Sequence, residues 1–196
     1  EMQMAEFRED LRMIADRKYL EQKLAIEERY DAELAPVLAA ERRYRLDAIA
    51  AFERFLERHP KDREFTPDAL FRLAELYFER HDDQHQQKME EFKKDYDEWV
   101  ANGSKGDMPE EPPQVFTDTI ATYERLIRDF PEYERMDGVY YLLGYSLEAQ
   151  GEPGDGMDAW RKLVNNYPES QFYAEVWFRI ADFHFEEELL KTDDEA

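Results

Sequence analysis

Apolar side chains recur every three or four positions along most of the chain, and this spacing predicts amphipathic helices. The clearest case is the segment 137–150, in which four positions fall on one helical stripe: Tyr140, Leu143, Gly144 and Leu147. Gly144 carries no side chain, so the pattern predicts that a neighbouring helix comes close to the backbone there. The segment therefore needs a second helix against this stripe.

The residues that follow predict this second helix. A turn rich in glycine and proline is expected at 151–156, and Trp160 and Leu163 then continue an apolar stripe at helical spacing. Pro168 ends the unit, because proline disfavours helical backbone at the residue before it. Such a pair of short helices cannot bury its apolar faces alone and needs similar pairs beside it.

The sequence contains such copies. An aromatic residue stands eight positions before a proline three times: Phe52 before Pro60, Tyr123 before Pro131 and Trp160 before Pro168. A small residue marks three first helices: Ala74, Gly144 and Ala181. The last two are 37 positions apart, which lies in the range of helix-turn-helix repeats with a period of about 34 residues.

These phased positions resemble the tetratricopeptide repeat superfamily over about residues 43–190. The family's usual order of large, small and aromatic positions is matched by Tyr140, Leu143, Gly144, Leu147, Gly156, Trp160, Leu163 and Pro168. Leu163 departs from the family's usual alanine, as do Phe55 and Leu126 in the other copies. The resemblance implies an all-α fold, a solenoid of antiparallel helix pairs over 37–191, with a long N-terminal helix and one repeat that carries a helical insertion.

The first 34 residues contain no glycine or proline and predict one long helix. An apolar seam begins at a spacing of three and four and is then interrupted: Met4, Phe7, Leu11 and Ile14 precede Lys18 and Glu21. Two interpretations of residues 1–36 remain open. The helix packs on the first repeat, which the small number of clean heptads favours, or it forms a coiled coil that dimerises the protein.

Pro36 suits the first turn of a helix, so a separate helix is expected over 37–59. The small residue that would mark its first helix, 24 positions before Pro60, is missing because Pro36 occupies that position. The long N-terminal helix is expected to substitute for this missing first helix. Thr66 is then expected to cap the next helix, with Pro67 at its first position.

The repeat period fails once, because about 33 extra residues are inserted at roughly 81–113. The first part continues the preceding helix through Val100 and carries an apolar stripe of Phe92, Tyr96 and Trp99. The remainder is rich in glycine and proline and predicts a loop. Two interpretations of the stripe remain open: it packs on the edge of the solenoid, or it is an insertion surface that binds a partner.

The last helix is expected over 172–191, with an acidic frayed end at 192–196. Its end is unusually apolar, with Phe183, Phe185 and the pair Leu189-Leu190. Because a solenoid needs a polar cap, we expect either further repeats beyond this helix or a partner that covers residues 183–190.

Composition narrows the classes of partner. The chain of 196 residues has 26 Lys and Arg against 48 Asp and Glu, a net charge of −22. This charge argues against nucleic acid and anionic lipid as ligands and favours protein partners with basic patches. No apolar run approaches the roughly 18 residues that a membrane-spanning helix requires. The chain has no cysteine, which excludes disulfides and thiolate metal sites but indicates no compartment.

The sequence contains no constellation that predicts an active site or a cofactor. His81 and His85 are four positions apart, which is half of a zinc site, but no third ligand can be named and a solvated helix face is expected. The glycines of 151–156 follow a helix rather than a strand and lack a Walker lysine. We therefore expect no catalysis, no cofactor and no metal.

In the absence of a predicted active site, the functional feature that the sequence predicts is a binding surface. In tetratricopeptide repeats the first helices line a concave face that holds a peptide or a partner helix. The resemblance carries this role to three residues in each of three copies: Phe71, Glu75 and Phe78; Tyr141, Tyr145 and Glu148; Phe178, Asp182 and Phe185. These side chains are aromatic and acidic, so the expected ligand carries apolar side chains with Lys or Arg. Alternatively, several of these aromatics belong to the core between repeats.

The sequences around Pro60, Pro131 and Pro168 are similar to those of tetratricopeptide proteins of the bacterial cell envelope, such as the outer-membrane assembly lipoprotein and the periplasmic Tol-Pal-associated protein. The similarity implies a periplasmic or envelope-associated scaffold in a multiprotein complex, with a cytoplasmic location as the alternative. A second function remains open: a structural self-association module, a homodimer for example, formed through the N-terminal helix and the apolar C-terminal helix.

Overall fold

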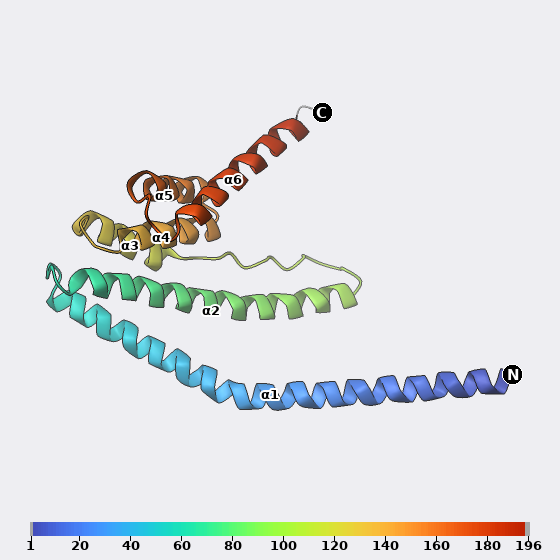
Figure 1. Ribbon diagram of the computed structural model, residues 1–196. Helices are drawn as coiled ribbons and strands as arrows, with labels where there is room; N and C mark the ends of the chain where they lie inside the picture. The colour runs from blue at the N-terminus through green and yellow to red at the C-terminus, as the bar shows by residue number, and fades with distance from the viewer. Residues whose placement is uncertain (1, 195–196) are drawn as a thin grey trace. The chain divides into compact units, whose positions relative to one another are not determined.

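The computed structural model describes the backbone of residues 2–194 and the side chains of residues 12–185. Within this range the chain forms six α-helices and no strand, which confirms the predicted all-α solenoid (Figure 1). The helices are α1 (Met2–Arg58), α2 (Thr66–Ala101), α3 (Thr117–Asp129), α4 (Met136–Ala149), α5 (Pro153–Asn166) and α6 (Tyr173–Asp194). Two compact units divide the chain, residues 1–46 and residues 47–196.

The first unit is a single stretch of helix. Its described side chains from residue 12 to residue 39 are all exposed, including apolar ones such as Ile14 and Tyr19. Ion pairs between residues four apart, Lys23 with Glu27 at 3.6 Å for example, each contribute a few tenths of a kcal/mol to such a helix. The helix therefore depends on residue propensity rather than on a core of its own.

The predicted break at Pro36 was wrong, because α1 passes through this residue. A proline inside a helix removes one backbone hydrogen bond and bends the helix. Here strong helix formers flank the proline on both sides, Ala35 before it and the run from Leu38 to Ala40 after it, and the helix continues. Residues 2–58 thus form one helix without a turn.

The second unit contains two complete helix pairs, α2 with α3 and α4 with α5, flanked by the last part of α1 and by α6. The second helices end two residues before the expected prolines: α1 at Arg58, α3 at Asp129 and α5 at Asn166. A first core cluster gathers residues from α1 to α5, and a second gathers residues of α5 and α6. Tyr123 and Trp160, the predicted aromatic positions, are each 1% exposed.

The predicted close approach at Gly144 is confirmed. Any Cβ at this position would clash with the indole of Trp160 on α5, and a Cβ at Gly156 would lie 2.8 Å from the carbonyl oxygen of Gly144. The indole Nε1 of Trp160 donates a hydrogen bond to the carbonyl oxygen of Tyr141, at 3.1 Å. The pair α4 and α5 is thus held by direct contact between backbone and aromatic ring.

The insertion lengthens α2 to 36 residues, as predicted, and residues 102–116 return the chain to α3. The Nε1 of Trp99 donates to the carbonyl oxygen of Gly106 at 3.3 Å, and Phe116 stacks on Phe78 with 4.7 Å between ring centroids. Since Phe78 lies 23 residues before the end of α2, the return segment runs back along more than half of this helix (Figure 1).

Three predicted boundaries need correction. The helix α2 begins at Thr66 itself, so Thr66 is not the residue that precedes and caps it. The loop before α2 is stabilised by Asp62, whose carboxylate accepts hydrogen bonds from the backbone N–H groups of Glu64 and Phe65 at 2.9 Å each. The turn after α4 is shorter than 151–156, because α5 begins at Pro153. Finally, α6 runs through Asp194 instead of ending at residue 191.

Candidate partner-binding face

The first helices α2, α4 and α6 carry the residues that the sequence analysis assigned to a concave binding surface. We call the set Glu75, Phe78, Tyr141, Tyr145, Glu148, Phe178, Asp182 and Phe185 the first-helix face. Direct contacts link its three helices. The rings of Phe78 on α2 and Tyr145 on α4 are 6.0 Å apart, and Tyr141 on α4 donates a hydrogen bond to Glu175 on α6 at 2.9 Å.

Phe71 does not belong to this surface, and its assignment to partner binding was wrong. The side chain is 2% exposed. Its ring makes an edge contact with Tyr123, 6.1 Å between centroids, and the guanidinium carbon of Arg135 lies 4.0 Å from its centroid. The start of α4 covers this position, so Phe71 contributes to packing between repeats.

Phe78 and Tyr145 form the aromatic centre of the face. Phe78 is half-buried because Phe116, at the end of the return segment, stacks on one side of its ring. Tyr145 is 38% exposed. An aromatic ring of this kind, partly fixed by neighbours and partly open, offers contact area at a low cost in side-chain entropy.

Sequence reasoning missed the residue that organises the charges of this face, Arg179 on α6. Its guanidinium lies 3.3 Å from the carboxylate of Glu148 and 3.2 Å from that of Glu175. The same group lies over the ring of Tyr145, 5.3 Å from its centroid. Burial alone would lower the pKa of Arg179, but the hydrogen bond to Glu175 and the charge of Glu148 more than compensate, so the net shift of the pKa is upward.

The carboxylates of the face are therefore only partly available to a ligand. Glu148 is paired with Arg179, and Glu75 is paired with Arg72 at 2.7 Å. Asp182 is exposed on α6. The face is aromatic with balanced charge near its centre, and the acidic character lies mainly in the rest of the second unit, where residues 47–196 hold 37 of the 48 Asp and Glu but 17 of the 26 Lys and Arg.

Tyr141 has a more structural position than Tyr145. Its ring stacks on Phe172 with 4.3 Å between centroids, and its hydroxyl donates to Glu175. Partial burial, followed by this hydrogen bond, raises the pKa of the phenol above its ordinary value. The side chain joins α4 to the entry of α6, and only part of it faces solvent.

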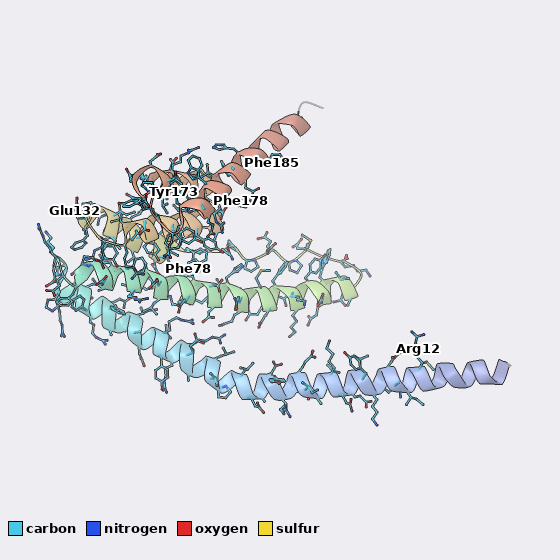
Figure 2. The ribbon with its side chains drawn as sticks, in the orientation of Figure 1. Arg12, Phe78, Glu132, Tyr173, Phe178 and Phe185 are labelled. Carbon is cyan, nitrogen blue, oxygen red and sulfur yellow. The ribbon has the colours of Figure 1, made fainter. Side chains whose placement is uncertain are left out.

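On α6 two aromatic residues of the first-helix face are open to solvent, whereas Phe183 is half-buried against the second core cluster. Phe178 is 70% exposed and Phe185 is 63% exposed (Figure 2). Of the apolar residues predicted at this end of the solenoid, Phe185 is thus exposed and Phe183 is not. Leu189 and Leu190, which the sequence analysis grouped with them, have side chains outside the described range.

The insertion surface is an aromatic ladder along the extension of α2. Ring centroids are 6.0 Å apart between Phe92 and Tyr96 and 5.8 Å apart between Tyr96 and Trp99. Phe92 and Trp99 are half-buried and Tyr96 is exposed. The hydrogen bond from Trp99 to Gly106 shows that the return segment covers part of the ladder, so at least Trp99 has an intramolecular role.

His81 is not on a solvated helix face, which corrects the sequence-based expectation. Its ring stacks parallel to Tyr77 at 6.5 Å and lies edge-on to Phe116 at 6.1 Å. Burial, and then the charge of Arg80, lower its pKa below the ordinary value, although the nearby Asp118 opposes this shift. Among the described residues, no group of three or more potential ligands is arranged to hold a metal ion.

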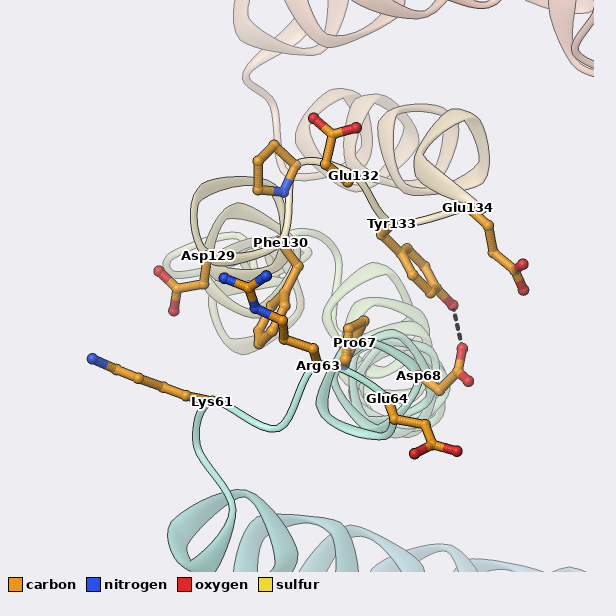
Figure 3. A pocket seen from close by; sticks show the side chains of 11 residues that line it. Lys61, Arg63, Glu64, Pro67, Asp68, Asp129, Phe130, Glu132, Tyr133 and Glu134 are labelled. Carbon is orange, nitrogen blue, oxygen red and sulfur yellow. Dashed lines mark hydrogen bonds between the residues drawn. The ribbon is translucent and has the colours of Figure 1, made fainter.

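A hollow between two loops of the second unit was not indicated by any sequence pattern. Five residues between Lys61 and Asp68 line one side and Asp129 to Glu134 line the other, around a volume of about 840 Å³ (Figure 3). Tyr133 donates a hydrogen bond to Asp68 across it, at 2.8 Å. The lining mixes cations and carboxylates without a cluster of one sign, so the hollow indicates no particular ligand.

Comparison with known protein families identifies the central pair. Residues 139–170, which comprise most of α4, all of α5 and the turn between them, match the family described as Tetratricopeptide repeat. Comparisons with curated proteins and with solved structures gave no significant match. The family match and the all-helical fold together support the tetratricopeptide repeat superfamily, whose members are generally non-catalytic scaffolds that bind other proteins. Among the described residues, every helix is too polar or too short to serve as a membrane-spanning segment.

Proposed function

We propose that this protein is a non-catalytic scaffold that binds a partner peptide or helix on the first-helix face. The observation that carries the proposal is the continuous cluster of Phe78, Tyr145 and Arg179, which joins three successive first helices. Helical repeats use such a surface because each repeat adds one more row of side chains to the same groove. Partly exposed aromatics supply the contact area, as at binding hot spots in other complexes.

The ligand we propose carries apolar side chains together with Lys or Arg. Tyr145 and Phe178 would contact the apolar side chains, and Asp182 would pair with a cation of the ligand. The excess of carboxylates over cations in residues 47–196 would accelerate the encounter with a basic partner, and this contribution decreases as salt screens it.

We further propose that the scaffold serves a multiprotein complex of the bacterial cell envelope, in the periplasm. The support for this location is the similarity of the sequences around the repeat-closing prolines to envelope tetratricopeptide proteins. A cytoplasmic scaffold is the alternative, and fractionation of the source cell distinguishes the two. The proposal includes no cofactor and no nucleic-acid ligand.

Site-specific photo-crosslinking tests the binding face. A photoreactive phenylalanine analogue replaces Tyr145, and the same analogue replaces Phe65 in a matched control, because Phe65 is an exposed aromatic residue outside the first-helix face. We expect a discrete crosslinked partner in source cells from position 145 and none from position 65. Equal crosslinking from both positions, or none from position 145, would contradict the proposal.

A further inference from the structure

A cluster of side chains around His81 surrounds the end of the return segment. The ring of His81 lies parallel to Tyr77, with 6.5 Å between ring centroids, and edge-on to Phe116 at 6.1 Å. The side chain of His81 is only 11% exposed. A titratable side chain is therefore largely buried at the point where the return segment joins α3.

The contacts of His81 with charged groups require a neutral ring. Its Nε2 lies 3.1 Å from a guanidinium nitrogen of Arg80. Arginine can only donate hydrogen bonds, so Nε2 accepts this one and the single ring proton lies on Nδ1. The same nitrogen of Arg80 donates to the carboxylate of Asp118, in the first turn of α3, at 2.6 Å. Asp118 is thus already paired with one cation.

A second proton on His81 would disturb these contacts. It would bind to Nε2, which would then face Arg80 as donor against donor and as one positive charge against another. Asp118 lies 3.5 Å from Nε2, but its side chain is 55% exposed and already paired, so it compensates only in part. Accordingly, burial and then the charge of Arg80 lower the pKa of His81, and Asp118 opposes them.

Other titratable and charged side chains lie around His81 on four elements: Glu53 of α1, Tyr77, Arg80 and His85 of α2, Asp118 of α3, and Glu152 after α4. Carboxylic acids ordinarily titrate near pH 4 and tyrosine near pH 10. Burial, and then the hydrogen bond to Glu53, raise the pKa of Tyr77 further. Between pH 5.5 and 7.5, histidine is therefore the side chain that ordinarily changes charge.

Phe116 connects this cluster to the first-helix face. Its ring stacks on Phe78 with 4.7 Å between ring centroids, and its backbone N–H donates to the Oε1 of Gln150 at 2.7 Å. Phe116 is 1% exposed and Phe78 is half-buried. A movement of Phe116 away from α2 would therefore expose His81 and uncover Phe78 at the same time.

We propose that His81 is a pH-sensitive latch, which keeps the end of the return segment docked on α2 while its ring is neutral and releases it when the ring is protonated. Docked His81 binds a proton less readily than released His81, so protonation favours release. Docking is therefore unaffected well above the ordinary histidine pKa of about 6.5, weakens as the pH falls below it, and levels off below the lowered pKa of the docked state. That release of Phe116 from Phe78 regulates partner binding rests on the proposed function, whereas the latch itself does not.

Hydrogen exchange of the Phe116 amide, measured by NMR at pH 7.5 and 5.5 and corrected for intrinsic exchange rates, tests the latch. We expect protection to decrease at pH 5.5 by at most about tenfold, because this pH lies one unit below the ordinary pKa of histidine. His81→Gln keeps a group that can accept a hydrogen bond from Arg80 but does not titrate, so its protection should not depend on pH. His85→Gln, one turn further along α2, is the matched control and should behave as the wild type.

An NMR titration of the histidine rings tests the same coupling in the reverse direction. We expect the pKa of His81 to lie below about 6.5 in the wild type and to increase in Gln150→Ala, which removes the acceptor of the Phe116 N–H and loosens the return segment. Circular dichroism at pH 7.5 checks that each variant folds, and the measurements on the wild type decide if one does not.

Four results would each overturn the proposal. They are a wild-type pKa of His81 at or above the ordinary value, protection of Phe116 that does not depend on pH, a loss of protection at pH 5.5 that persists in His81→Gln, and an unchanged pKa of His81 in a folded Gln150→Ala variant. None of these results bears on crosslinking at position 145.

Discussion

At the scale of single residues, contact between a small residue and an aromatic one holds α4 against α5. Gly144 lies against Trp160 and Ala74 occupies the same position one repeat earlier, fully buried. The sequence predicts these contacts because they recur at fixed distances from proline. It does not predict Arg179, because its contacts with Glu148 and Tyr145 join different repeats and depend on how the repeats stack. Likewise, Phe71 is buried and Phe178 is exposed although both occupy the same position of the repeat, because only Phe71 is covered by a following helix.

Gly144→Ala tests this contact at the level of one methyl group. The added Cβ would clash with the indole of Trp160, and overpacking of a well-packed core costs about 1–3 kcal/mol. We expect the free energy of unfolding, measured by urea denaturation, to decrease by about this amount.

Gly154→Ala is the matched control within α5, since a Cβ there meets no atom within 4 Å. Replacement of glycine by alanine inside a helix usually stabilises it by about 0.5–1 kcal/mol. Equal effects of the two substitutions would show that α4 and α5 are not in the close contact described.

At the scale of elements, the sequence predicts the identity of the helices better than their boundaries. The uninterrupted helical pattern of the insertion predicts the extension of α2, and the glycine and proline residues after it predict the return loop. The break expected at Pro36 fails because one lost hydrogen bond does not outweigh the helix formers on both sides of it. The entry to α2 also differs, because the hydroxyl of Thr66 donates to the carbonyl oxygen of His59 and does not cap the helix, while Asp62 in the preceding loop accepts the N–H groups of Glu64 and Phe65.

Pro36→Ala tests the account of α1. It restores the missing backbone hydrogen bond and removes the ring from the helix interior, where proline costs about 3 kcal/mol. Amide hydrogen exchange should therefore become slower on both sides of residue 36. Pro153→Ala provides the control, because Pro153 lies at the start of α5, where its missing N–H has no helical partner. Unchanged exchange around residue 36 would contradict a continuous α1.

At the scale of the whole molecule, the second unit is a short solenoid with two complete helix pairs, flanked by residues 47–58 of α1 and by α6. Its repeated architecture follows from the phased small, aromatic and proline positions, and the family match at residues 139–170 supports the central copy. The residues of the candidate binding face can be predicted from the sequence only in part. Position within the repeat predicts Tyr145 and Phe78, but exposure depends on neighbouring repeats and on the return segment, neither of which the local spacing encodes.

The affinity of the protein for the segment crosslinked at position 145 tests the central claim most directly. Isothermal titration compares the wild type with Tyr145→Ala and with Phe65→Ala, the control truncation of an exposed aromatic residue. Loss of an aromatic hot spot costs about 2 kcal/mol or more, so we expect Tyr145→Ala to weaken binding more than tenfold and Phe65→Ala to leave it unchanged. Equal affinities of all three proteins would show that recognition does not take place on the first-helix face.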